Sequence, residues 1–348
     1  MLSRQWHRQD LRERGNKMTD NSKEQVLFRP NSYIGRTVPR PNARRLLSGR
    51  SSYTDDITLP RMVHVAFLRS PHAHAQIVRV DKAAAERADG VVKVVTGDEM
   101  AQVCSPWVGV LAHLEGIKSA EQHILALKKA TWQGEPVVAV VARSRALAED
   151  AIELIQIDWK TLPVVTDMKA GLAQNAPVIH AELGDNLAWR RSLDAGDVET
   201  SYINAAHVIE QEYISNRHTG VCPEGRSIIA DFNPAEEQMT IYQSTQAPHM
   251  MQSLFAKHIG LQAHKVRVIC KDVGGAYGIK VHAYPDEFAA VALAYMLKRP
   301  VKFIADRRES FLSDIHARDH RINTKVAVSE DGDITAFEID DWTGVGPY

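Results

Sequence analysis

A run of seven apolar residues, Pro136–Ala142, does most to limit what this chain can fold into. The run follows a loop rich in chain-breaking residues and predicts a strand. Ser144 can cap the helix that follows, because its hydroxyl can accept from the first free backbone N–H groups. Five apolar residues share one face of that helix: Leu147, Ala148, Ala151, Ile152 and Ile155. The chain then returns as a strand over 155–159, so this region predicts one compact α+β unit.

The same periodicity predicts the remaining elements. The first unit also contains strands at 62–68, 75–80 and 91–96 and a short helix at 82–87, and it ends near Pro163. Residues 165–198 have weak periodicity and are predicted to connect two domains. Further strands are predicted at 207–213, 227–232, 239–243, 266–271, 301–305, 321–328 and 334–341, and helices at 249–259 and 285–297. The turn Glu330–Asp333 predicts a hairpin between the last two strands.

The bulk composition excludes several classes of protein. A chain of 348 residues is long enough for two domains. With 44% hydrophobic residues and 42 Lys+Arg against 43 Asp+Glu, it predicts a soluble globular protein that binds neither nucleic acid nor a membrane. Three cysteines without a C-x-x-C pair indicate no disulfide framework and no zinc or iron–sulfur site, and they favour a reducing, cytoplasmic setting.

The two ends of the chain carry expectations of their own. Residues 1–32 are polar, lack an apolar signal-peptide core and are expected to be disordered, and Met18 is an alternative start within them. At the other end, the last strand stops at Tyr348 without a closing helix. A sheet that finished there would leave a long unpaired edge, so a larger domain is expected to continue.

Two segments of the second half carry the strongest chemical signal. Gly274–Lys280 is a glycine-rich turn between a strand and a helix, and glycine lets backbone donors approach an anionic, phosphate-bearing or pterin-like ligand. It is neither G-x-G-x-x-G nor a P-loop, and the alternative is a tight structural turn. In Ser244–His249, the Gln246 amide could bond to an oxo group or a hydroxyl. The alternative for Gln246 is helix capping, which Ser244 and Thr245 could also provide.

Two histidine clusters are further candidates for binding sites. His72 and His74 would share one face of a strand as a metal pair, but no third ligand is evident, so turn and packing roles are favoured. His316, Arg318 and His320 could bind an anion, although a solvated, ion-paired face is the commoner explanation.

Glu224 and Arg226 are two charges that enter an apolar strand. Burial would demand partners for both, so paired structural roles are predicted. No carboxylate of the sequence stands out as a general base.

Several motifs in order resemble the molybdenum-binding large subunit of the xanthine dehydrogenase, aldehyde oxidase and aerobic carbon monoxide dehydrogenase family. In the first half these are Ile34–Arg40, Tyr53–Ile57, Arg69–Ala75, Gly134–Ala142 and Ala148–Ala151. The resemblance implies that 33–165 is an α/β-hammerhead domain, that 166–198 is a linker, and that 199–348 is the first part of a mixed α/β molybdenum-cofactor-binding domain.

The second half continues the resemblance through Pro223–Arg226, Ser244–His249, Gly274–Lys280 and Asp306–Glu309. It implies that Gln246 lies near an oxo ligand of molybdenum. It also implies that five consecutive residues line the metal–pterin face: Gly274, Gly275, Ala276, Tyr277 and Gly278. Tyr277 stands where the family usually has Phe, and Ala276 where Gly is common.

The resemblance also bears on substrate and partners. Val281 replaces the Glu expected in purine-oxidising members, which disfavours xanthine and leaves aldehydes, N-heterocycles and carbon monoxide open. The general-base Glu and the Cys-bearing loop of carbon monoxide enzymes are expected beyond Tyr348, so this chain alone is expected to show negligible turnover.

The implied activity is oxidative hydroxylation with molybdenum–molybdopterin, in its cytosine dinucleotide form. Electrons would pass to a 2Fe-2S small subunit and an FAD-binding medium subunit, and a C-terminal half chain is a further expected partner. The alternative is a non-catalytic assembly module or relic fragment that binds no molybdenum.

Overall fold

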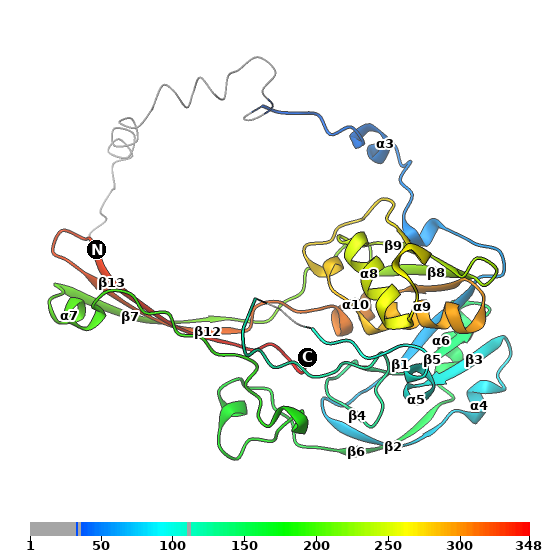
Figure 1. Ribbon diagram of the computed structural model, residues 1–348, viewed down its shortest axis with the longest axis horizontal. Coiled ribbons are helices and arrows are strands. Elements are labelled where there is room, and N and C mark those ends of the chain that lie inside the picture. Colours follow the sequence, from blue (N-terminus) through cyan, green and yellow to red (C-terminus); the bar gives the residue numbers. More distant parts are fainter. Residues whose placement is uncertain (1–32, 34–35, 110–112) are drawn as a thin grey trace, which may run out of the picture. The chain divides into compact units, whose positions relative to one another are not determined.

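The computed structural model describes residues 33, 36–109 and 113–348, and these form two units that are considered separately (Figure 1). The first unit ends at Ser51, and its described part contains one short helix, α3 (Ala43–Leu47). The second unit runs from Ser52 to Tyr348 and holds every strand found among the described residues. The predicted disordered extension, 1–32, lies outside the described residues.

The strands and helices predicted for the first half are present, with boundaries that differ by at most two residues. The strands are β1 (Val63–Arg69), β2 (Ala75–Asp81), β3 (Val91–Thr96), β5 (Pro136–Ala142) and β6 (Gln156–Thr161), and the helices are α4 (Ala83–Glu86) and α6 (Arg145–Ile152). Ser144 caps α6 as predicted, because its side chain accepts from the backbone N–H of Leu147. The structure adds the short helix α5 (Gly97–Ala101), the two-residue strand β4 (Lys129–Ala130) and the 3-10 helix η2 (Thr54–Asp56).

The second half also follows the prediction. Its strands are β7 (His207–Ser215), β8 (Ser227–Asn233), β9 (Gln238–Gln243), β10 (Val266–Ile269), β11 (Val301–Ile304), β12 (His320–Val328) and β13 (Ile334–Thr343). Its long helices are α8 (Pro248–Ile259) and α9 (Pro285–Leu297), and α7 (Val198–Ile203), α10 (Arg307–Ser313) and the 3-10 helices η5 (Ala263–Lys265) and η6 (Ile279–Val281) are additional. The predicted connecting stretch contains two 3-10 helices, η3 (Ala170–Leu172) and η4 (Ala181–Leu183).

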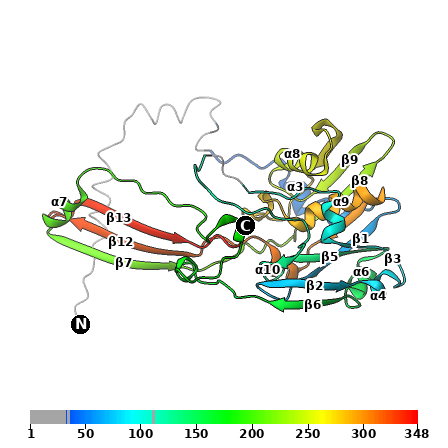
Figure 2. The same ribbon diagram turned by 60° about the horizontal axis from the view of Figure 1, so that its bottom comes forward.

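One seven-stranded sheet combines strands from both sides of that connecting stretch, in the order β10-β9-β8-β11-β1-β5-β3. Figure 2 labels β1, β3 and β5 of the first half and β8 and β9 of the second. The two halves meet where β1 pairs in parallel with β11, with Val63 opposite Val301. The pairs β9–β10 and β1–β11 are parallel, and every other neighbouring pair in this sheet is antiparallel. The halves are therefore joined through backbone hydrogen bonds.

The apolar run Pro136–Ala142 becomes β5, which is buried along its whole length. Alternate residues of a strand point to opposite faces. Ala139 and Val141 accordingly join the core that contains α8 and α9, whereas Val138 and Val140 join the core that contains α4 and α6. A strand between two layers of helices has to be apolar on both faces, and this explains its composition.

Two smaller sheets flank this arrangement. β2 pairs antiparallel with β4 and β6, and β12 lies between β13 and β7 in a second antiparallel sheet. The hairpin predicted between β12 and β13 is present, with Gly332 at φ +87°. In the part of the chain that the structure describes, no helix combines the length and the apolar character needed to cross a membrane.

Candidate functional site

The two segments predicted to carry the chemistry leave the sheet at adjacent strand ends. β9 and β10 are parallel neighbours, with Tyr242 opposite Ile269, so both carboxyl ends lie at the same edge. Ser244–Gln246 follows β9, and the turn Gly274–Gly278 follows β10. Close contact begins directly after the strands, since the Cys270 thiol lies 3.2 Å from the carbonyl oxygen of Thr245. Ligands of open α/β sheets commonly bind at such carboxyl ends.

The backbone of Lys280 links the two segments. Its carbonyl oxygen accepts from the Gln246 N–H at 2.9 Å and from the Thr245 hydroxyl at 3.0 Å. The structure therefore brings Gln246 beside the end of the glycine turn. The Gln246 side chain is exposed, and no hydrogen bond links its amide to any other described residue.

The capping alternative for Gln246 is wrong. α8 begins after Ala247, has Pro248 in its first turn and lacks a side-chain cap. The Thr245 hydroxyl accepts from the Ala247 N–H in a local turn, while the Ser244 hydroxyl donates to Glu224. Neither Ser244 nor Gln246 satisfies the start of the helix, so the Gln246 amide stays available to a ligand.

Glu224 forms hydrogen bonds to both segments. Its Oε2 accepts from the Gly274 N–H at 2.7 Å, from the Ser244 hydroxyl at 2.7 Å and from the Lys280 ammonium at 2.8 Å. Lys280 is buried and also donates to the Ser244 hydroxyl at 3.0 Å. The paired structural role predicted for Glu224 is confirmed, but the sequence did not identify the partners.

The glycine turn has a left-handed backbone at three positions. The Ile279 N–H donates to the Ala276 carbonyl at 2.8 Å, and φ is +49° at Tyr277 and +89° at Gly278 between them. Positive φ at both central residues is the type I′ geometry. Gly275 also has a positive φ, of +99°. Tyr277 is not glycine, so its backbone is strained, and its side chain is 76% exposed.

The turn offers donors that the protein does not use. Within residues 36–109 and 113–348, no acceptor is bonded to the backbone N–H of Gly275, Ala276, Tyr277 or Gly278. At Gly274, a Cβ would lie 2.6 Å from the Cβ of Glu224, so only glycine permits this approach. Unused donors on a tightly held turn beside an exposed amide fit an oxygen-rich, anionic ligand. This donor set fits a molybdenum–pterin group.

A cluster of buried charged residues is centred on Arg226, close in sequence to Glu224. Arg226 is fully buried and binds Asp286 at 2.5 Å, Asp314 at 2.6 Å and the Ser313 hydroxyl at 2.9 Å. Its guanidinium lies 3.8 Å from the centre of the Tyr284 ring. The predicted paired role of Arg226 is thus confirmed. The cluster joins β8, α9 and α10 next to the glycine turn.

Arg69 extends this cluster into the first half of the chain. Its guanidinium binds Asp286 and Glu309, each at 2.9 Å. Arg69 stands at the head of the motif Arg69–Ala75, whose role the sequence did not reveal. It ties the end of β1 to the N-terminal ends of α9 and α10.

Asp286 and Glu287 are adjacent buried carboxyls with opposite pKa shifts. Burial alone would raise the pKa of Asp286, but the charges of Arg226 and Arg69 and their hydrogen bonds outweigh it and hold the pKa at about 2. Burial dominates at Glu287 and raises its pKa to about 8, although Gln243 donates to its Oε2 at 2.7 Å. Neither residue was predicted from the sequence. The available signal was two acids at the start of an otherwise apolar helix.

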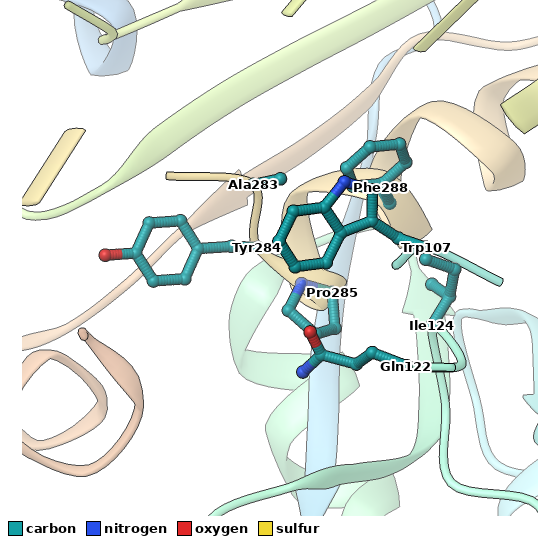
Figure 3. A pocket seen from close by; sticks show the side chains of 7 residues that line it. All are labelled: Trp107, Gln122, Ile124, Ala283, Tyr284, Pro285 and Phe288. Atoms are coloured by element: carbon teal, nitrogen blue, oxygen red, sulfur yellow. The ribbon is translucent and has the colours of Figure 1, made fainter. Parts of the chain in front are cut away.

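An apolar depression lies beside the start of α9 (Figure 3). Its empty space of about 160 Å³ is open to solvent and leaves no room for a water-sized sphere, so the depression does not form a small-molecule site. Seven residues line it: Trp107, Gln122, Ile124, Ala283, Tyr284, Pro285 and Phe288. The Tyr284 hydroxyl donates to the Ile279 carbonyl and accepts from the Ile315 N–H, so this ring is fixed between η6 and the segment after α10.

The histidine clusters take structural roles. His74 Nδ1 lies 2.7 Å from the Pro163 carbonyl, and the His72 ring packs edge-on against Trp159. His320 pairs with Asp341 at 3.0 Å, as expected for an ion-paired face. Among the described residues, no group of three His, Cys, Asp or Glu side chains could hold a metal ion.

Two family models match this chain. Residues 48–163 match the aldehyde oxidase and xanthine dehydrogenase a/b hammerhead domain, and residues 179–348 match the molybdopterin cofactor-binding domain. The chain belongs to the xanthine dehydrogenase, aldehyde oxidase and carbon monoxide dehydrogenase family of large subunits. This family consists of molybdopterin-dependent oxidoreductases. The predicted fold, a hammerhead domain followed by part of a molybdenum-cofactor-binding domain, is confirmed.

Individual relatives agree with the family models. The chain is 36% identical to the nicotine 6-hydroxylase large subunit of Paenarthrobacter nicotinovorans, across 90% of this chain and 38% of that protein. It is 31% identical to the carbon monoxide dehydrogenase large chain of Hydrogenophaga pseudoflava, across 85% of this chain and 38% of that protein. The solved structure of quinoline 2-oxidoreductase from Pseudomonas putida 86 superposes with a TM-score of 0.85 at 34% identity. The superposition covers 88% of this chain and 39% of that chain. The chain thus spans about two-fifths of the length of these relatives.

Proposed function

We propose that this chain forms one wall of the molybdenum–pterin site in a molybdenum hydroxylase. The observation that carries the proposal is the Lys280 carbonyl, which accepts from both Thr245 and Gln246 and so holds the exposed amide beside the glycine turn. The unused N–H groups of the turn and the free amide then face a ligand together. The family membership supports this interpretation of the geometry.

Each residue would have a defined task. The Gln246 amide would orient an oxo group by donating a hydrogen bond to it. The unused N–H groups from Gly275 to Gly278 would bind oxygens of the pterin or its phosphate, while Gly274 keeps the turn close to Glu224. Tyr277 would cover the edge of the bound group with its exposed ring. The molybdenum–pterin group, when bound, would supply the two-electron redox chemistry.

We assign oxidative hydroxylation of an N-heterocycle as the reaction, ahead of aldehydes and carbon monoxide. Two relatives that match this chain are named for nicotine and quinoline, which are N-heterocycles. Val281 leaves the position after Lys280 without a carboxylate, in keeping with a substrate other than a purine. The cofactor would be the cytosine dinucleotide form, and electrons would pass to 2Fe-2S and FAD subunits in the cytoplasm.

The general base would come from polypeptide outside this chain. Among the described residues, the buried acids near the site are already engaged: Glu224 binds Lys280, and Asp286 binds Arg226 and Arg69. Glu287 is bonded to Gln243 and buried. We therefore expect negligible substrate oxidation by the 348-residue chain alone, and turnover by the purified chain would contradict this assignment.

The alternative function is an assembly module or relic that binds no molybdenum. Measuring the cofactor content of the purified chain distinguishes this alternative from the proposed cofactor-binding function. Molybdenum and pterin would be measured per chain after purification from a host that makes molybdopterin. Gly278 and Gly332 provide matched variants, because their φ angles are +89° and +87° and a Cβ added at either position would meet no atom within 4 Å. Gly278→Leu should lose the cofactor and Gly332→Leu should keep it. Wild-type chain without molybdenum or pterin would overturn the proposal.

A further inference from the structure

One face of the β13-β12-β7 sheet carries a group of exposed apolar side chains, with polar ones such as Gln211 and Thr324 between them. Register places Ile209, Val326 and Phe337 side by side across the three strands, and Tyr213 beside Ile322. These side chains share one face, here called face A, because successive residues alternate sides. The apolar side chains on the flanking strands are 54–57% exposed: Ile209, Tyr213, Phe337 and Ile339.

The opposite face already has partners within the chain. The Tyr202 hydroxyl of α7 donates to the Lys325 carbonyl, and Ala336 is buried. Towards the other end of the sheet, Asp167 binds Arg321 at 2.5 Å and Lys169 lies over the Trp342 ring. Figure 1 shows α7 at one end of the three long strands. Face A is therefore the side on which exposed apolar residues lie next to one another across all three strands.

The chemistry of face A fits a protein surface. In the described part of the chain, the residues of these strands that point to face A include no Lys or Arg. A membrane surface or a nucleic acid would be recognised by basic residues. An antiparallel sheet commonly has one face packed on a core and one solvated, and exposed apolar faces of this kind mark interaction sites.

One connection leads from face A to the candidate site. β7 continues through His218, which bridges to Ala317, and reaches Gly220 and Glu224. A Cβ at Gly220 would lie 3.0 Å from the Cβ of Tyr277, so this connection packs directly against the strained turn. A partner on face A would therefore sit at the end of the segment that carries Glu224.

We infer that face A docks the polypeptide that corresponds to the remainder of the large subunit, whether that polypeptide is joined to this chain or separate. The chain spans 38% of the nicotine 6-hydroxylase large subunit, so relatives carry a further body of protein that this chain does not match. This inference rests on the proposed function, since it names the partner that completes the same site. A second copy of this chain is the competing occupant.

The test uses two isoleucines of β7 that differ in the face they occupy. Ile209 is 57% exposed on face A and Ile214 is 64% exposed on the opposite face. Each would be changed to Lys, and both variants should retain the wild-type circular dichroism. The probe is the part of the nicotine 6-hydroxylase large subunit that this chain does not match, and binding would be followed by calorimetry. We expect Ile209→Lys to weaken binding at least tenfold and Ile214→Lys to change it less than threefold.

Several outcomes would overturn the inference. One is that the wild-type chain does not bind the probe, and another is that the two variants weaken binding equally. A third is that the wild-type chain sediments as a dimer that only Ile209→Lys dissociates, which would assign face A to a second copy. The measurement requires no molybdenum. A chain that binds the probe but contains no molybdenum–pterin cofactor would therefore refute the proposed function and support the docking surface. A chain that contains the cofactor but does not bind the probe would support the proposed function and refute the docking surface.

Discussion

Glu224 and Lys280 form an ion pair of 2.8 Å beneath the candidate site, and the Lys280 side chain is 1% exposed. The pair joins the segment before β8 to the end of the glycine turn. Because Ser244 and Gly274 bond to the same carboxylate oxygen, a single side chain sets the spacing between two segments that would face a cofactor. The site therefore depends on a charge that no ligand needs to touch.

Removing one partner of this pair should be costly. Lys280→Met leaves the largely buried Glu224 carboxylate without its counter-charge, and we expect a loss of about 3–5 kcal/mol in the free energy of unfolding. Glu224→Leu combined with Lys280→Met should recover part of this loss. Urea denaturation of the single and double variants would measure the coupling, and additive losses would show that the pair contributes nothing jointly.

Two glycines of the turn should respond to alanine for different reasons. Gly274→Ala places a Cβ 2.6 Å from the Cβ of Glu224, and such overpacking costs about 1–3 kcal/mol. Gly278→Ala meets no atom within 4 Å and should cost only about 1 kcal/mol, through its left-handed backbone. Urea denaturation should also show that Glu224→Gly, which removes the Cβ of residue 224, lessens the cost of Gly274→Ala. An unchanged cost in that background would place the clash elsewhere.

Tyr277 should be a position where stability and function oppose each other. Asn tolerates a left-handed backbone better than Tyr, so Tyr277→Asn should stabilise the chain by up to about 1 kcal/mol. The same change removes the exposed ring and should lower the pterin content of the purified chain. Thermal unfolding and pterin fluorescence would be compared on one preparation. A destabilised variant would mean that the ring is held by the protein itself.

The buried acids should give the chain a distinctive pH profile. Glu135 is a buried residue directly before β5. Burial raises the pKa of Glu287 to about 8 and that of Glu135 to about 7, so both bind more protons when folded than when unfolded. Their contribution is therefore fully present below about pH 4.5 and is lost as pH rises through 7 and 8. Glu287→Gln should flatten the decline in unfolding free energy between pH 5 and 8, because the amide needs no proton. An unchanged slope would show that Glu287 is ionised in the folded chain.

Asp286 should behave in the opposite sense. Its pKa of about 2 lies below the ordinary value, so its contribution is present above about pH 4 and is lost as pH falls towards 2. Asp286→Asn leaves the buried Arg226 short of a counter-charge and should cost about 3–5 kcal/mol at pH 7. Chemical denaturation at pH 7 would measure the loss, with Glu287→Gln as the neighbouring control. Equal effects at the two positions would contradict the assigned charges.

The sequence predicted individual elements well because their signals are local. Alternation and apolar runs placed β5 and α9, and Ser144 marked the start of α6. Long-range pairings have no local signal, so the parallel contact of β1 with β11 could not be read from either strand. The partners of Glu224 were hidden for the same reason, since Gly274 and Lys280 are distant in sequence. The roles assigned to Gln246 and the glycine turn remain predictions.

The pairing of β1 with β11 has a consequence for how the chain is made. Val63 pairs with Val301, so the interior strand β1 is synthesised long before its neighbour β11 exists. Contacts so distant along the chain give a high contact order and slow folding. Until β11 emerges, a nascent chain would hold β1 with one open edge, a state prone to aggregation and dependent on chaperones. Residues 48–163 expressed alone should therefore be poorly soluble, even though they match a family model of their own.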